Sequence, residues 1–238
     1  MDPADFYTGI VADLYAPLKA YSQDPGLYDA FVREAGGPAL ELGCGDGEPL
    51  LELRRRGLDV EGVDSSADML ARLRREADVQ GIGVTVHHQR MEALDLPRRY
   101  RAVFLAGPTF NLLPDDATAL AALRGIRAHL DEGGTALIPL FTPTPTAPET
   151  IGAVRTVTAP DGAELRVSVV SERRDEQART QTTLLRYERH HGADSVVEDR
   201  PWVLHWYDRF EHLAETAGLT TTSVTEQDGV RHHRLRPA

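Results

Sequence analysis

The chain has 238 residues, of which 41% are hydrophobic and 26% charged, a composition typical of a globular protein with one sizeable domain and an elaboration, or with two small domains. Its formal net charge of −11 argues against a nucleic-acid partner and against docking on anionic lipid, because surfaces that neutralise phosphates carry a basic excess. No apolar run reaches the roughly 18 residues that a membrane-spanning helix needs. We therefore expect neither nucleic acid nor a membrane among its partners.

Two further features concern the compartment. Cys44 is the only cysteine, so no intrachain disulfide can form and a reducing compartment fits. The first seven residues carry two aspartates and lack the basic start of a signal peptide. We expect a cytoplasmic protein.

The N-terminal segment, residues 1–36, is predicted to be helical, with a break at 24–26, and we interpret it as a lid. In residues 37–141, short apolar runs then alternate with helical patterns. The predicted strands are 38–42, 58–64, 84–88, 101–106 and 135–141, and the predicted helices are 48–56, 65–78 and 114–130. This alternation predicts an α/β fold with a Rossmann-like, doubly wound, mostly parallel sheet, whose ligands bind at the carboxyl ends of the strands.

The pattern changes after the fifth predicted strand. Residues 142–205 begin with a proline-rich connector and then contain β-rich runs, which predict an antiparallel insertion. Its predicted strands are 154–158, 164–171, 180–189 and 196–205. The insertion could cap the core or form a homodimer contact, because a long strand edge invites pairing with a second copy. Residues 206–238 are predicted to complete the core with a helix, 207–217, and two closing strands.

The strongest local signal is the run Glu-Leu-Gly-Cys-Gly-Asp-Gly-Glu at 41–48, which ends a predicted strand and begins a helix. Glycines permit backbone angles closed to other residues and let the main chain approach a ligand. The dinucleotide fingerprint G-x-G-x-x-G would need a glycine where Glu48 stands, and its carboxylate would repel a pyrophosphate. The chain also has no G-x-x-x-x-G-K-[ST] phosphate loop. The spacing that fits is E-x-G-x-G-x-G.

Four stretches in register over residues 38–141 resemble the motifs of class I S-adenosylmethionine-dependent methyltransferases. They are ELGCGDGE (41–48), VDSSADML (63–70), LDLPRRYRAVFLAGPTFNLL (94–113) and HLDEGG (129–134). The resemblance implies S-adenosyl-L-methionine as the cofactor. This cofactor carries a sulfonium and an ammonium cation. Acids near the loop, such as Glu41 and Asp46, attract these cations, whereas they would repel the phosphates of a dinucleotide.

The resemblance also implies cofactor contacts at successive strand ends. Asp64 is expected to accept hydrogen bonds from the ribose hydroxyls, although it could instead cap the following helix. Gln89 or Arg90 stands where the family usually has an adenine-binding acid. The expected cofactor residues are Tyr15, Glu41, Gly43, Cys44, Gly45, Gly47, Asp64, Ser65, Met69, Gln89, Arg90, Met91, Glu92 and Ala106.

The acceptor has no dependable motif, because in-line methyl transfer mainly requires alignment of the acceptor with the sulfonium. Tyr15 and Tyr21 resemble lid residues of methyltransferases that act on amino sugars, the alternative being a packed amphipathic helix. The expected acceptor residues are Tyr21, Phe110, Asn111, Trp206 and Tyr207. His205 is the preferred general base, with a structural histidine as the alternative. The pair His232 and His233 has no further ligand near it in sequence, and no spacing indicates a metal site.

We therefore expect a methyltransferase that acts on N or O of a small metabolite. The absence of Asn-Pro-Pro-Tyr after the fourth strand argues against methylation of a planar base or amide nitrogen. Two alternatives remain open: an enzyme of this fold that binds S-adenosylmethionine but catalyses another reaction, and a non-catalytic binding module. The intact glycines at 43, 45 and 47 argue against the last.

Overall fold

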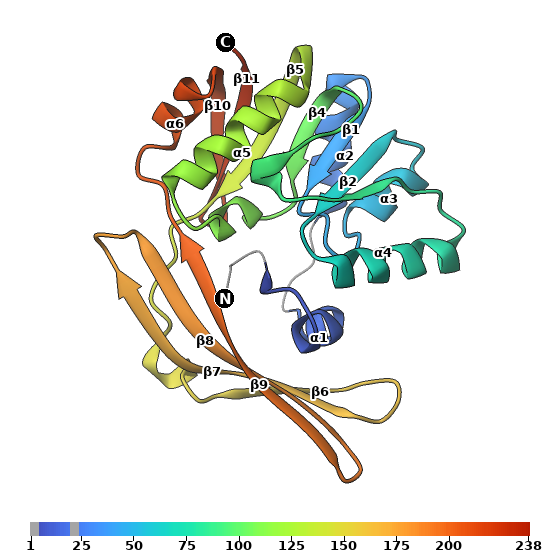
Figure 1. The fold of residues 1–238 in the computed structure, drawn as a ribbon, viewed down its shortest axis with the longest axis vertical. Helices are drawn as coiled ribbons and strands as arrows, with labels where there is room; N and C mark the ends of the chain where they lie inside the picture. The colour runs from blue at the N-terminus through green and yellow to red at the C-terminus, as the bar shows by residue number, and fades with distance from the viewer. Residues whose placement is uncertain (1–4, 20–23) are drawn as a thin grey trace.

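The computed structural model describes residues 5–19 and 24–238, which form two β-sheets with helices on both faces of the larger one (Figure 1). The larger sheet, the core sheet, has the strand order β10-β11-β5-β4-β1-β2-β3. Its strands are β1 (Ala39–Leu42), β2 (Val60–Asp64), β3 (Val86–His88), β4 (Tyr100–Leu105), β5 (Leu130–Leu140), β10 (Leu219–Gln227) and β11 (Val230–Pro237). Strands β1 to β5 pair in parallel, and β11 is antiparallel to both β5 and β10. The prediction of a doubly wound, mostly parallel sheet is confirmed.

Helices cover both faces of the core sheet because side chains alternate along its strands. In β1, Leu40 joins the apolar cluster beneath α5 and α6, whereas its neighbour Ala39 joins the cluster beneath α2, α3 and α4. These helices are α2 (Pro25–Ala35), α3 (Leu50–Arg55), α4 (Ala67–Gln80), α5 (Asp116–His129) and α6 (Phe210–Thr216). No helix in the described ranges is long and apolar enough to cross a bilayer.

The second sheet is antiparallel and lies after β5 in the chain, in the order β6-β7-β8-β9. Its strands are β6 (Val154–Thr158), β7 (Glu164–Asp175), β8 (Thr180–His191) and β9 (Asp194–His205). The helix α1 (Ile10–Leu18) packs against this sheet through a separate apolar cluster that includes Phe6, Leu14 and Leu165. The predicted antiparallel insertion is confirmed, and α1 lies between the two sheets in Figure 1.

One predicted break is confirmed and one predicted boundary is wrong. The N-terminal helical segment is interrupted, since α1 ends at Leu18 and α2 begins at Pro25. The Asp24 side chain accepts a hydrogen bond from the Gly26 amide at 2.8 Å and caps α2, with Pro25 in the first helical position. The predicted start of the fifth strand at residue 135 is wrong. The strand already begins at Leu130, which pairs with Tyr100, and the glycines at 133 and 134 fall within an irregularity of the β4–β5 register.

Candidate functional site

A cavity of about 910 Å³ lies among the carboxyl ends of the core strands, α1 and the second sheet. This volume is near the top of the roughly 300–1,000 Å³ typical of small-molecule pockets. Residues 43–45 after β1 and 64–65 at the end of β2 line one part of it, and Trp202 and Leu204 of β9 line another. The cavity is therefore at the edge where ligands of doubly wound sheets bind, and it has room for more than one small molecule.

The loop after β1 brings a bare main chain to the cavity. Gly43 and Gly45 have φ values of 70° and 52°, and the amides of Gly43 and Cys44 both donate to the carbonyl of Val63, at 2.8 and 3.0 Å. A Cβ atom at Gly43 would lie 2.6 Å from Cγ2 of Thr109, and one at Gly45 would lie 3.5 Å from Cε of Met69. Thr109 and Met69 both line the cavity, so side chains at these glycines would occupy ligand space.

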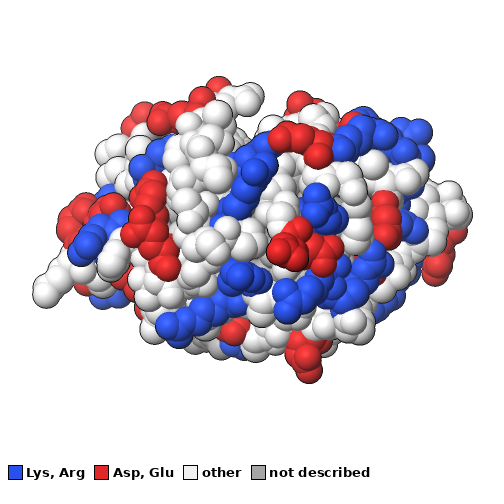
Figure 2. Space-filling view, turned by 90° about the horizontal axis from the view of Figure 1, so that it is seen from above, with Lys and Arg blue, Asp and Glu red and all other residues white. Residues whose placement is uncertain are grey.

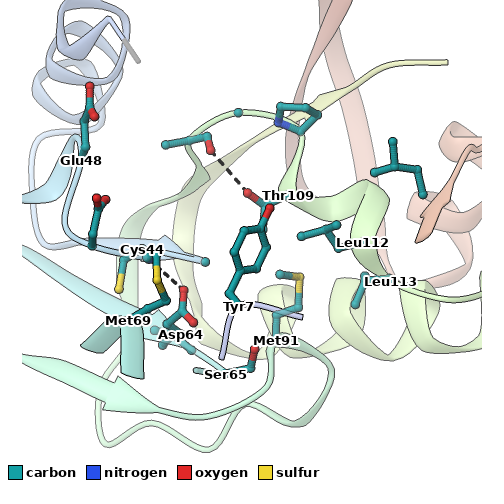
Figure 3. A pocket seen from close by; sticks show the side chains of 18 of the residues that line it. Tyr7, Cys44, Glu48, Asp64, Ser65, Met69, Met91, Thr109, Leu112 and Leu113 are labelled. Carbon is teal, nitrogen blue, oxygen red and sulfur yellow. Dashed lines mark hydrogen bonds between the residues drawn. The ribbon is translucent and has the colours of Figure 1, made fainter. Parts of the chain in front are cut away.

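Asp64, at the end of β2, holds the glycine loop that follows β1 through a hydrogen bond. Its Oδ2 accepts a hydrogen bond from the Gly45 amide at 2.8 Å (Figure 3). Its Oδ1 accepts one from the Ser66 amide, also at 2.8 Å. Burial raises the pKa of Asp64, and these two backbone bonds act in the opposite direction. Each oxygen keeps a further acceptor position for a hydroxyl. The alternative role of Asp64 as N-cap of α4 is wrong, because the Ser66 hydroxyl accepts from the Met69 amide and fills that role.

The segment after β3 also lines the cavity, through Gln89, Arg90, Met91 and Glu92. The Gln89 side chain donates to the carbonyl of Asp95 at 2.8 Å and accepts from its amide at 2.9 Å, so it holds its own loop. A guanidinium nitrogen of Arg90 lies 3.6 Å from a carboxylate oxygen of Glu92. The thioether of Met91 is the apolar group that this segment offers to a ligand.

The segment that contains α1 covers the cavity. The carbonyl of Tyr7 accepts from the Ser66 hydroxyl at 2.6 Å, which ties this segment to the start of α4. The rings of Tyr7 and Tyr15 meet edge-to-face at 5.5 Å, and both residues line the cavity. Lys19 forms an ion pair with Glu48 of the glycine loop. Of the two tyrosines expected in a lid, Tyr15 thus lies at the cavity, and Tyr21 lies outside the described residues.

Tyr7 was not identified from the sequence, and it lies centrally. In the view of Figure 3, its ring stands between Asp64 and Met69 on one side and Leu112 and Leu113 on the other. The only sequence signal for Tyr7 is that it is an aromatic residue eight positions before Tyr15 in the same segment.

Two expected cofactor residues, Glu41 and Gly47, lie behind the cavity lining, whereas Ala106 at the end of β4 does line it. Gly47 has φ 101°, and a Cβ there would lie 2.9 Å from Cγ of Leu51, so helix packing requires this glycine. Glu41 is fully buried, and neither carboxyl oxygen has a hydrogen-bond partner among the described residues. Burial, with Asp64 and other acids nearby, raises the pKa of Glu41 well above its usual range.

The structure corrects the expected acceptor residues. Phe110 and Tyr207 belong to the apolar cluster under α5 and α6, with ring centroids 5.4 Å apart. Asn111 is fully buried and bonds to backbone, and Trp206 stacks against the guanidinium of Arg174 at 4.1 Å. None of these four residues lines the cavity.

His205, the expected base, also lies outside the lining. Only 2% of its surface is exposed, and its Nε2 lies 3.1 Å from Oδ1 of Asp116 at the start of α5. This placement agrees with the alternative interpretation, a structural histidine.

The part of the cavity away from the glycine loop is lined by other residues. The apolar ones are Leu112, Leu113, Phe141, Trp202 and Leu204. The hairpin between β10 and β11 contributes Gln227, Asp228, Val230 and His232. Its turn places Asp228 and Gly229 at φ 52° and 75°, as a two-residue hairpin turn requires. An Asp-Gly pair is a sequence signal for such a turn. Its place at the cavity depends on the strand order, in which β11 pairs with β5.

These features fit S-adenosylmethionine. Bare backbone at Gly43 and Gly45 makes room for a nucleoside and its amino acid, and Asp64 can accept from ribose hydroxyls. Asp46 and Glu48 beside the loop suit a cationic ligand better than a pyrophosphate.

Comparisons with known proteins agree with this geometry. A family model described as a methyltransferase domain matches residues 39–134. A dTDP-3-amino-3,6-dideoxy-alpha-D-glucopyranose N,N-dimethyltransferase of Streptomyces fradiae is 30% identical, over 92% of this chain and 87% of the relative. Among solved structures, the CcbJ methyltransferase from Streptomyces caelestis is 25% identical with a TM-score of 0.77, covering 100% of this chain and 98% of that one. The sugar N-methyltransferase KedS8 from Streptoalloteichus has the same fold, with 21% identity, a TM-score of 0.75, and coverage of 97% and 94%.

The fold and the loop define an enzyme that uses S-adenosylmethionine. The chain belongs to the class I S-adenosylmethionine-dependent methyltransferases. Its cofactor is S-adenosyl-L-methionine.

Proposed function

We propose that this enzyme transfers a methyl group to the nitrogen of a small-molecule amine. The observation that carries the proposal is a single cavity with the cofactor loop at one end and an apolar, aromatic-lined wall at the other. The names of the Streptomyces fradiae relative and of KedS8 support nitrogen over oxygen as the acceptor atom. An excess of carboxylates around the cavity also favours an acceptor that arrives as a cation.

The roles of the residues follow from their places around the cavity. When bound, the cofactor supplies a methyl group on a sulfonium, which is already a good leaving group. We assign Asp64 to the ribose and Tyr7 and Tyr15 to closing the cavity and excluding water. Alignment of the amine against Leu112 and Leu113 then provides most of the rate, because proximity is the main requirement of in-line transfer.

An amine that enters as an ammonium must lose a proton before its nitrogen can attack. His232 lines the cavity from the β10–β11 hairpin and is partly buried. Burial lowers the pKa of His232, and its backbone hydrogen bond at Val230 acts in the opposite direction. We assign His232 as the residue that takes this proton.

The test is a panel of small amines and their hydroxyl analogues, incubated with the enzyme and S-adenosylmethionine. We expect S-adenosylhomocysteine release with one or more amines, and mass spectrometry should locate the added methyl group on nitrogen. Methylation of the hydroxyl analogues alone would assign oxygen instead. Cofactor binding without S-adenosylhomocysteine release across the panel would favour a different reaction.

A further inference from the structure

Positive charge is scarce around the cavity. Among the described residues, six carboxylates and two basic side chains, Lys19 and Arg90, line it. The carboxylates are Asp24, Asp46, Glu48, Asp64, Glu92 and Asp228. Lys19 is the only lysine of the chain, and residues 1–4 and 20–23 contain no arginine.

Both basic side chains lie at the cofactor end. Lys19 pairs with Glu48 and lies 3.8 Å from Asp46, so it is held by the glycine loop. Arg90 follows β3, 3.6 Å from Glu92. The acceptor wall is mostly apolar, and the β10–β11 hairpin adds the polar Gln227 and His232 and the charged Asp228.

Backbone amides do not replace the missing cations at the acceptor wall. The helix α5 begins there, and Pro114 and Thr118 line the cavity. A helix N-terminus can hold a phosphate through its free amides. Here, however, the Asp115 side chain accepts from the Thr118 amide at 2.8 Å and occupies that position. The next residue, Asp116, adds a second carboxylate, which is paired with Arg179 and His205.

The basic residues of the chain are abundant elsewhere. Figure 2 views the molecule from the end of the core sheet opposite the second sheet, and blue side chains are frequent there, interspersed with red ones. A diphosphate group at the acceptor wall would therefore meet repulsion from Asp228, and the two basic side chains of the lining, Lys19 and Arg90, lie at the cofactor end.

We propose that the acceptor is an amine without a phosphate group, which enters as an ammonium on an uncharged and partly apolar scaffold, with Asp228 at the rim as the carboxylate that attracts it. This inference rests on the proposed N-methyl transfer and makes its substrate class narrower. It separates this enzyme from the Streptomyces fradiae relative, whose name specifies a nucleotide-linked amino sugar. Aromatic side chains such as Tyr7 and Trp202 also suit an ammonium, through cation–π attraction.

The first test is calorimetric titration of thymidine diphosphate into the enzyme saturated with S-adenosylhomocysteine. We expect no binding up to about 1 mM, and a Kd below about 100 µM would overturn the proposal. A parallel assay compares the nucleotide-linked 3-amino-3,6-dideoxyglucose with the methyl glycoside of the same amino sugar. Faster methylation of the nucleotide-linked form would overturn the phosphate-free acceptor while leaving N-methyl transfer intact. If no amine of either kind is methylated, N-methyl transfer fails, and the titration still decides whether phosphate is excluded.

The second test replaces Asp228 by asparagine, which tolerates the positive φ of this turn position. With the best amine of the panel, Asp228→Asn should raise KM about two- to fivefold at low salt and leave kcat unchanged, because a rim charge contributes modestly and is screened. Glu226→Gln on the same hairpin is the control, since Glu226 does not line the cavity. An unchanged KM in Asp228→Asn, or an equal rise in Glu226→Gln, would remove Asp228 from the proposal.

Discussion

The side-chain amide of Asn111 donates a hydrogen bond to the carbonyl oxygen of His205 over 2.7 Å. The same amide nitrogen donates to the carbonyl of Phe141 at 3.0 Å, and the amide oxygen accepts from the Phe141 backbone N–H at 3.2 Å. Phe141 directly follows β5 and His205 ends β9, so one side chain joins the two places where the chain passes between the sheets.

Replacing Asn111 by alanine should destabilise the protein by about 2–3 kcal/mol, because it leaves backbone groups at Phe141 and His205 without their partner in a buried place. Urea denaturation measures the free energy of unfolding. The affinity for S-adenosylhomocysteine, measured on the folded variant, should stay unchanged because Asn111 lies outside the cavity. A stable Asn111→Ala variant with weak cofactor binding would contradict this structural role.

The cofactor end of the site could be predicted from the sequence because its signals are local. The glycine loop and Asp64 each follow directly from a strand end, and parallel strands bring their ends to one edge. Similarly, β6 occupies the residues predicted for it, 154–158, and the Asp-Gly pair at 161–162 marks the turn that follows.

The acceptor end could not be predicted, because adjacent residues of one element face opposite sides. Leu204 lines the cavity, whereas the next residue of β9, His205, faces α5. The same holds for β11, where His232 lines the cavity and His233 packs against Phe210 at 4.7 Å. The sequence indicated these segments, and only the register of the sheet decides which of their side chains faces the cavity.

Asp64→Ala should weaken S-adenosylhomocysteine binding about 10- to 100-fold, because charge-assisted bonds to the ribose hydroxyls are lost. The amides of Gly45 and Ser66 lose their acceptor as well, so thermal unfolding must be measured beside calorimetry. Asp78→Ala is the matched control, since Asp78 is an exposed acid at the other end of α4. Equal affinity in Asp64→Ala and the wild type would exclude the ribose role.

Gly45→Val should abolish cofactor binding, because a branched side chain beside Met69 fills the cavity and the position has φ 52°. Gly81→Val is the control for backbone strain alone. Gly81 also has a positive φ, 67°, and a Cβ there would meet no atom within 4 Å among the described residues. We expect both variants to lose stability, and only Gly45→Val to lose binding in calorimetry. Loss of binding in both would trace the effect to strain.

Glu41→Gln tests the buried acid behind the loop through the pH dependence of stability. The pKa of Glu41 is raised by burial, so between its ordinary value of 4.5 and the raised value the unfolded chain releases a proton that the folded chain keeps. The wild type therefore loses stability as pH rises through this window, and glutamine removes the loss. Urea denaturation should give equal stability at pH 4 and a more stable Glu41→Gln variant at pH 8. Parallel curves for the two proteins from pH 4 to 8 would show that the carboxyl titrates normally.

His232→Gln tests whether His232 takes the proton from the ammonium substrate. With the best amine of the panel, kcat/KM at pH 7 should fall about 10- to 100-fold, because the ammonium then has to lose its proton to water. At a pH above the pKa of the amine, the amine is already neutral. The kcat/KM of the variant should therefore approach that of the wild type. His212→Gln is the control, since His212 is an exposed residue of α6 outside the cavity. A deficit of the same size at both pH values would mean that His232 positions the acceptor and does not take its proton.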